Sequence, residues 1–177
     1  MANKFLIVVD MQNDFIDAAL GSAQAQAIVP AVVDRIRAAR MDGETIIATL
    51  DTHAQDYLST PEGRKLPVEH CIKGTEGWKI RDEIVEAMGD AILLEKPTFG
   101  SVRLPELIGG MMEEPADTTI ELLGLCTDIC VVSNTLLLKA HYPDARIVVR
   151  EACCAGVTVE KHLAALETMR SCQIDVI

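Results

Sequence analysis

Three residues that together could form a hydrolytic site stand at the ends of separate apolar runs. They are Asp10, Lys96 and Cys130. A carboxylate can accept the proton of a thiol, a nearby ammonium lowers the pKa of that thiol, and the resulting thiolate is a strong nucleophile. Each residue taken singly also has an ordinary structural interpretation: Asp10 as a turn residue, Lys96 as a solvated lysine and Cys130 as a small buried side chain. Together they predict a cysteine hydrolase.

The segment around Cys130 favours a thiolate for a second reason. Thr127 or Asp128 is expected to cap the helix that runs on to His141, which would place Cys130 in the first helical turn. Free backbone N–H groups and the helix dipole stabilise negative charge there. We therefore expect a lowered pKa for this thiol.

The elements that must position these residues follow from hydrophobic patterning. Four apolar runs without alternation, and two further short runs, predict strands at Phe5–Val9, Thr45–Leu50, Ala91–Leu94, Thr118–Leu123, Arg146–Val149 and Ile174–Ile177. Apolar residues at three and four spacing predict helices between them, within Ala23–Met41, Trp78–Met88, Ile129–His141 and Val159–Arg170. This alternation predicts a three-layer αβα fold with a mainly parallel, doubly wound sheet of about six strands. Because no linker interrupts the chain, residues 1–177 are expected to form a single domain.

Composition excludes several classes of function. The 177 residues are 49% hydrophobic, and 16 basic against 27 acidic residues give a formal charge of −11. Such a charge disfavours binding to nucleic acid or anionic membranes. Of the six cysteines, Cys71, Cys153, Cys154 and Cys172 have no role that the sequence reveals. A chain of this size needs no disulfide framework, and its first residues lack the pattern of a signal peptide, so we expect a cytoplasmic protein.

The longest stretch without periodicity, residues 51–77, carries a possible metal site. Asp51 and His53 are two residues apart on what should be extended backbone, and His70 lies downstream. Three such ligands with open positions fit a catalytic or substrate-binding Zn²⁺, Fe²⁺ or Mn²⁺. By the alternative reading, these histidines are ordinary surface residues of a loop.

Several motifs occur together along the whole chain, in the segments Asp10–Phe15, Asp51–His53, His70–Thr75, Lys96–Phe99 and Cys126–Cys130. In type and order they resemble the isochorismatase-like cysteine hydrolase superfamily, and within it the nicotinamidase-related amidohydrolases. The resemblance implies that Asp10, Lys96 and Cys130 form a catalytic triad. It also implies a cis peptide bond between Leu125 and Cys126, with the N–H groups of Cys126 and Cys130 forming an oxyanion hole.

The same resemblance extends to the metal and to the substrate. Glu62 has the spacing of a fourth metal ligand, and Phe15 and Phe99 correspond to walls of the substrate pocket. Leu66 stands where many nicotinamidases carry a tryptophan that stacks on the pyridine ring. This departure concerns the choice of nicotinamide as substrate and leaves the amide chemistry unaffected.

The expected function is hydrolysis of a small carboxamide, nicotinamide to nicotinate and ammonia, through a thioester. The partner is thus a small-molecule amide, with a divalent metal, zinc before iron or manganese, as cofactor. Alternatives are hydrolysis of a ureido or carbamoyl compound or of isochorismate, or a non-catalytic binding member of the fold. The resemblance also implies a homo-oligomer.

Overall fold

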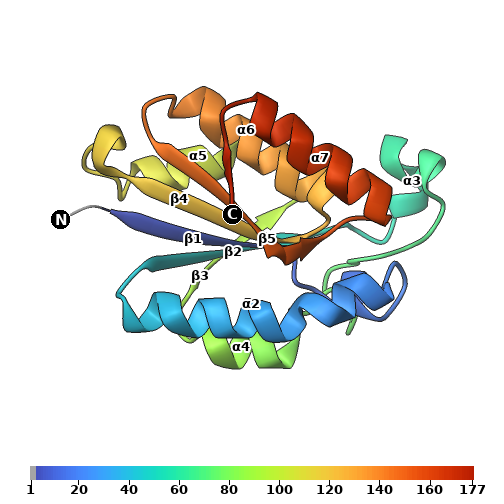
Figure 1. The fold of residues 1–177 in the computed structure, drawn as a ribbon. Helices are drawn as coiled ribbons and strands as arrows, with labels where there is room; N and C mark the ends of the chain where they lie inside the picture. Colours follow the sequence, from blue (N-terminus) through green and yellow to red (C-terminus); the bar gives the residue numbers. More distant parts are fainter. Residues whose placement is uncertain (1–2) are drawn as a thin grey trace.

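A six-stranded sheet forms the centre of the computed structural model, which describes residues 3–177 (Figure 1). The strands are β1 (Lys4–Val9), β2 (Thr45–Asp51), β3 (Ile92–Lys96), β4 (Thr119–Leu125), β5 (Arg146–Ala155) and β6 (Asp175–Val176). All neighbouring strands are parallel, in the order β3-β2-β1-β4-β5-β6. The predicted doubly wound α/β fold is confirmed.

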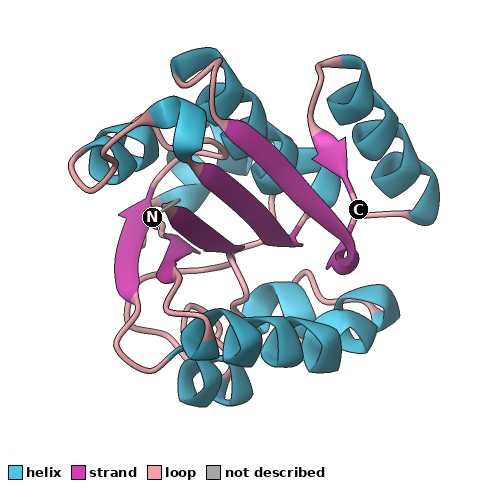
Figure 2. Ribbon diagram, turned by 60° about the vertical axis from the view of Figure 1, so that its left-hand side comes forward, coloured by secondary structure: helices cyan, strands magenta, loops and turns pink. Residues whose placement is uncertain are grey.

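Two layers of helices enclose the sheet (Figure 2). On one face lie α2 (Ala23–Met41) and α4 (Asp82–Met88), and on the other α5 (Arg103–Gly109), α6 (Val132–His141) and α7 (Val159–Ser171). Because both faces are covered, the central strands are apolar along their length, and residues 5–9 of β1 are all buried. Short helices α1 (Asn13–Ile16) and α3 (Pro61–Lys65) and the turns η1 (Tyr57–Ser59), η2 (Pro115–Asp117) and η3 (Thr127–Val131) complete the chain.

Some element boundaries differ from those predicted. The helix expected over Trp78–Met88 begins only at Asp82, because Ile80 forms a β-bridge with Gln12 and its neighbour Arg81 donates its N–H to Met11. Strand β5 extends past Val149 to Ala155, because the polar residues after Val149 interrupt the apolar run without ending the strand. The loop 51–77 contains η1 and α3, and α5 had no counterpart among the predicted helices.

The strand order reverses between β1 and β4, since the chain proceeds from β1 toward β2 on one side and from β4 toward β5 on the other. In such sheets a crevice opens beyond the carboxyl ends of the two strands at the reversal. Asp10 follows β1 directly, and the turn η3 follows β4 after a single residue. The predicted catalytic segments therefore meet at the switch point. Over residues 3–177, no helix combines the length and apolar character needed to cross a bilayer.

Candidate active site

Asp10, Lys96 and Cys130 converge at the carboxyl end of the sheet. The ammonium nitrogen of Lys96, the last residue of β3, lies 2.7 Å from Oδ2 of Asp10 and 3.4 Å from Sγ of Cys130. The Asp10 and Lys96 side chains have no solvent-exposed surface, and Cys130 is 3% exposed. A single buried cation thus contacts both a carboxylate and a thiol.

Burial dominates the protonation of this group. It raises the pKa of Asp10 in spite of the opposing charge of Lys96. Burial, followed by the negative charge of Asp10, also raises the pKa of the Cys130 thiol well above its ordinary value, and Lys96 only partly offsets this. The expectation of a lowered thiol pKa is therefore wrong for the free enzyme. The thiol keeps its proton until a base removes it, and Asp10 is the carboxylate that shares its cation.

The turn that carries Cys130 is fixed by hydrogen bonds to another segment of the chain and not by a helix cap. Residues 127–131 form a π-helical turn whose N-cap is Cys126, so the predicted capping by Thr127 or Asp128 is wrong. Thr127 Oγ1 instead lies 2.8 Å from Nδ1 of His162 on α7, and Asp128 Oδ1 accepts a hydrogen bond from the N–H of Val157 at 2.9 Å. Both side chains tie the turn to the segment that leads into α7.

A buried asparagine, absent from the sequence-based site, links Cys130 to the pocket wall. Asn134 Nδ2 donates to the carbonyl oxygens of Cys130 at 2.8 Å and Phe99 at 3.1 Å, and its Oδ1 accepts from the N–H of Ser101 at 2.9 Å. The sequence could have indicated this role, because Asn134 lies four residues after Cys130 and such residues are neighbours on a helix. The peptide bond between Leu125 and Cys126 is cis, as the resemblance implied.

The four predicted metal ligands also lie together. One ligand atom from each of Asp51, His53, Glu62 and His70 lies within 4.8 Å of the other three. Asp51 Oδ2 is 3.1 Å from His53 Nε2 and 3.6 Å from His70 Nε2. Because two imidazole nitrogens and two carboxylates converge from mostly buried side chains, the cluster fits a zinc, iron or manganese ion.

Asp51 belongs to both groups of residues. Its Oδ1 lies 3.4 Å from Nζ of Lys96, while its Oδ2 faces the two histidines. Burial would raise the pKa of Asp51, but hydrogen bonds with His53 and His70 and the charge of Lys96 hold it well below its usual range. This carboxylate is therefore ionised and negatively charged at neutral pH, as a metal ligand must be.

Two polar side chains of the first motif fix this cluster. Gln12 donates to the carbonyl oxygen of Asp51 at 2.9 Å and accepts from its N–H at 2.7 Å. Asp14 accepts from the N–H of Cys71 at 2.7 Å, next to His70. Cys71 has a φ of 47°, which few non-glycine residues adopt, so this contact holds a strained backbone in place. Sequence reasoning assigned no role to Gln12 or Asp14.

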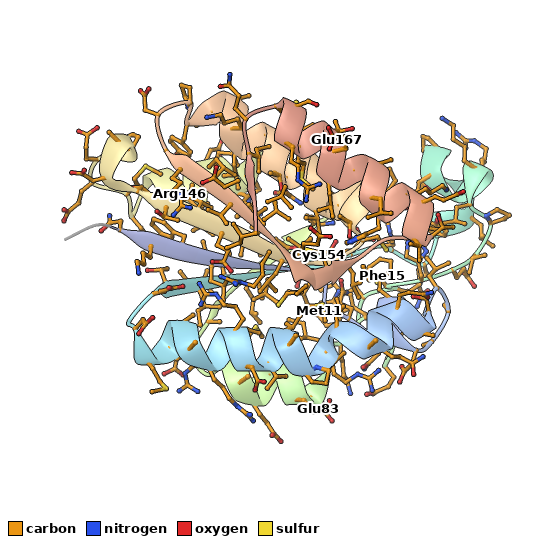
Figure 3. All side chains as sticks on the ribbon, viewed as in Figure 1. Met11, Phe15, Glu83, Arg146, Cys154 and Glu167 are labelled. Atoms are coloured by element: carbon orange, nitrogen blue, oxygen red, sulfur yellow. The ribbon has the colours of Figure 1, made fainter. Side chains whose placement is uncertain are left out.

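A cavity of about 380 Å³ opens onto both groups. The three predicted substrate contacts, Phe15, Leu66 and Phe99, line it together with Cys126 and Cys130. Phe15 is buried at the carboxyl end of the sheet (Figure 3), and Leu66 and Phe99 are partly exposed. The remaining walls are mainly apolar, from residues that include Leu20, Pro61 and Ile129. The cavity can hold a small, largely apolar ligand with its reacting atom beside Sγ.

Comparison with known proteins gives a consistent result. The sequence model of the isochorismatase domain family matches residues 4–177 of the chain. The chain is 28% identical to a nicotinamidase of Schizosaccharomyces pombe over 97% of its length and 91% of that protein. The structure of a Pyrococcus horikoshii pyrazinamidase in complex with zinc is similar at a TM-score of 0.84 and 27% identity, over 99% of this chain and 98% of that one. The structure of an N-carbamoylsarcosine amidase from Thermoplasma acidophilum is similar at a TM-score of 0.79 and 26% identity, over 98% of this chain and 95% of that one.

Proposed function

The chain belongs to the isochorismatase family of hydrolases, and we propose that it is a cysteine-dependent amidohydrolase that converts nicotinamide to nicotinate and ammonia. One observation carries this proposal. A buried lysine ammonium contacts both the Asp10 carboxylate and the Cys130 thiol, at a cavity bordered by a metal-ligand cluster. This is the arrangement that thioester chemistry on a small carboxamide requires.

Acylation begins with transfer of the thiol proton. Asp10 takes the proton from Sγ of Cys130, and the sulfur forms a bond to the carbonyl carbon of the amide. Lys96 remains positively charged beside both groups and compensates the negative charge as it moves from oxygen to sulfur. Asp10 then gives its proton to the departing nitrogen, and ammonia leaves a thioester on Cys130.

Deacylation uses the same carboxylate. Asp10 takes a proton from water, whose oxygen attacks the thioester carbon. The C–S bond then breaks and Asp10 gives that proton to the departing sulfur, which releases the carboxylic acid and restores both the thiol and the carboxylate. In both halves the backbone N–H groups of Cys126 and Cys130 are proposed to bind the oxyanion, since both residues line the cavity.

The cluster at one side of the cavity is proposed to hold zinc, with iron or manganese as alternatives. Asp51, His53, Glu62 and His70 would be its ligands. When bound, the ion supplies a Lewis-acidic position that can accept a ring nitrogen of the substrate. The residues themselves orient one another, because Gln12 fixes Asp51 and the rings of Phe15 and Tyr57 lie 5.6 Å and 4.9 Å from that of His70.

Substrate choice separates this proposal from hydrolysis of a carbamoyl or ureido compound. The metal cluster favours a carboxamide on a nitrogen heterocycle, whereas the likeness to an N-carbamoylsarcosine amidase favours the carbamoyl or ureido class. Ammonia release should therefore be measured with nicotinamide, pyrazinamide and N-carbamoylsarcosine side by side. Release from the two heterocyclic amides supports the proposal, and release from the carbamoyl compound alone would replace it.

Isochorismate hydrolysis and a purely binding role have less support. Isochorismate is not an amide, and its hydrolysis does not rely on a cysteine nucleophile. A non-catalytic binding member would not need a carboxylate, a cation and a thiol in mutual contact at a cavity. A cytoplasmic location and self-association stay predictions.

A further inference from the structure

The hydroxyl of Thr49 is the closest hydrogen-bond partner of the Asp10 carboxylate. Thr49 lies on β2 and is fully buried, and its Oγ1 is 2.6 Å from Oδ1 of Asp10. The N–H of Asp10 is directed at the same residue, 3.3 Å from Oγ1 and 3.2 Å from the carbonyl oxygen of Thr49. Both the main chain and the side chain of Asp10 are thus held by one threonine.

The direction of these hydrogen bonds follows from chemistry. A hydroxyl has one proton to donate, and a backbone N–H can only donate, so Oγ1 accepts from Asp10 N. The single hydroxyl proton is then free to go to Oδ1, which as an ionised oxygen can only accept. Oδ1 therefore faces the uncharged hydroxyl, whereas Oδ2 lies 2.7 Å from the Lys96 ammonium, the same group that contacts Sγ of Cys130. Within the described chain, no hydrogen bond of regular geometry ends on Oδ2.

We infer that Thr49 is a positioning residue in the proposed reaction. Its hydroxyl donates a hydrogen bond to Oδ1 of Asp10, so that Oδ2 is the oxygen that accepts and releases the proton. This inference rests on the proposed function of Asp10 as base and acid. The S–H bond of Cys130 breaks as an O–H bond forms at Oδ2, and the same proton later passes to the leaving nitrogen. A proton placed on Oδ1 would face the hydroxyl proton of Thr49 and remove its acceptor.

The surroundings of Asp10 make this assignment consequential. The charged or titratable groups around it are Lys96 from β3, Asp51 from β2 and Cys130 from η3, and its charge also acts on the buried or half-buried thiols of Cys71 and Cys126. Burial raises the pKa of Asp10, and the Thr49 hydrogen bond opposes that rise. Loss of the hydroxyl should therefore raise this pKa further and free the carboxylate to rotate, so that Oδ1 and Oδ2 compete for the proton.

The test compares Thr49→Val, Thr49→Ser and a control, Thr45→Val, four residues earlier on the same face of β2. With nicotinamide, kcat of Thr49→Val should fall about 10- to 100-fold, as expected for loss of a hydrogen bond to a charged group, with KM changed less than about twofold. The acidic limb of its pH–rate profile should move to higher pH by about one unit. Thr49→Ser and Thr45→Val should keep both kcat and the limb near wild type.

A substrate-independent measurement separates this inference from the proposed function. Alkylation of Cys130 by iodoacetamide, followed by peptide mass spectrometry across the same pH range, reports the same base. If the wild type releases no ammonia, the proposed function fails. A shifted acidic limb of alkylation in Thr49→Val alone would still support the role of Thr49.

Unchanged kcat and an unchanged limb in Thr49→Val would overturn the inference, as would equal losses in Thr49→Ser. If Thr49→Val does not fold, Thr49→Ala against Thr49→Ser gives the same comparison, because these two differ only by the hydroxyl.

Discussion

Two groups of charged residues lie at opposite ends of the sheet, and only one of them is proposed to perform chemistry. At the carboxyl end are Asp10, Lys96 and Cys130. The other group, the arginine–glutamate cluster, consists of Arg35, Glu44, Glu121 and Arg150. It borders a cavity of about 400 Å³ near the amino end, where Figure 3 also places Arg146. Both groups therefore combine opposite charges with a neighbouring cavity, but Asp10 and Lys96 are fully enclosed, whereas Arg35 and Arg150 are partly exposed.

The difference lies in how completely the charges are paired. Both oxygens of Glu121 accept hydrogen bonds from Arg35 and from Arg150, over distances of 2.6 to 3.2 Å. Such bidentate pairs leave no group free to react. In the group of Asp10, Lys96 and Cys130, one ammonium is shared between two carboxylates, Asp10 and Asp51, and a thiol. The proposed catalytic group therefore differs from the arginine–glutamate cluster in its incomplete pairing as well as in its deeper burial.

The largest expected effect on activity comes from removing the proposed nucleophile. Cys130→Ala should lower ammonia release from nicotinamide by a factor on the order of 10³ or more, because no thioester can form. A discontinuous ammonia assay measures this. Cys154→Ala, a buried cysteine on β5 that does not line the catalytic cavity, is the control and should keep its activity. Wild-type turnover in Cys130→Ala would rule out the mechanism.

Asp10→Asn should separate activity from stability. Loss of the base is expected to lower kcat by a factor on the order of 10² to 10⁴. Burial raises the pKa of Asp10 in the folded protein, which by itself would make its ionised form destabilise the fold at neutral pH. The charge of Asp10 in turn raises the pKa of the buried Lys96, so the same contact stabilises the folded state from the side of the lysine. Because the two effects oppose each other, the variant should melt close to the wild-type temperature. A marked fall in Tm would show that the ion pair with Lys96 outweighs the burial of Asp10.

Removal of the proposed metal ion should lower the activity without affecting the arginine–glutamate cluster at the other end of the sheet. After dialysis against a chelator, ammonia release is expected to fall by a factor on the order of 10², because the substrate is no longer held in the reactive orientation, and added Zn²⁺ should restore it. The Tm should fall equally in wild type and in Cys130→Ala, since ion binding does not need the thiol. Elemental analysis showing no divalent ion in the purified protein would contradict the proposed site.

Glu121→Gln should lower the stability of the protein and leave its activity unchanged, the opposite of the pattern expected for Asp10→Asn. Activity is expected to be unchanged, while the free energy of unfolding falls by roughly 3 kcal/mol, because two arginines lose their charged partner. Burial would raise the pKa of Glu121, but hydrogen bonds from Arg150 and Arg35 lower it below its usual value of about 4.3. The carboxylate thus stabilises the fold above that value, and this contribution is lost as the pH falls through the folded-state pKa.

Denaturant unfolding of wild type and Glu121→Gln at several pH values measures that contribution. The difference in free energy should be constant near neutrality and shrink in acid. A difference that did not depend on pH would mean that packing, not charge, accounts for the loss.

Much of the fold could be predicted because it depends on local patterning. Uninterrupted apolar runs indicated parallel strands, and parallel strands bring their carboxyl ends to one edge. The meeting of Asp10, Lys96 and Cys130 followed from that rule. The identity of the metal ligands needed the resemblance to a known family as well, since Glu62 stands in α3, which had no predicted helical pattern.

What could not be predicted depends on tertiary register and burial. Thr49 meets Asp10 because β2 pairs with β1 so that Thr49 lies beside Val9. Asn134 reaches Phe99 only because α6 packs beside the segment after β3. The raised pKa of Cys130 depends on enclosure that no local pattern reports. Glu121 lay within an apolar run and gave no hint of its partners.

The shared carboxylate of Asp51 constrains any redesign of this protein. Its two oxygens contact different neighbours, so replacing it to change ion binding at the proposed metal site would also disturb Lys96, which contacts Cys130. Protein engineers seeking an ion-free variant, or one that prefers another ion, should therefore begin with the histidines.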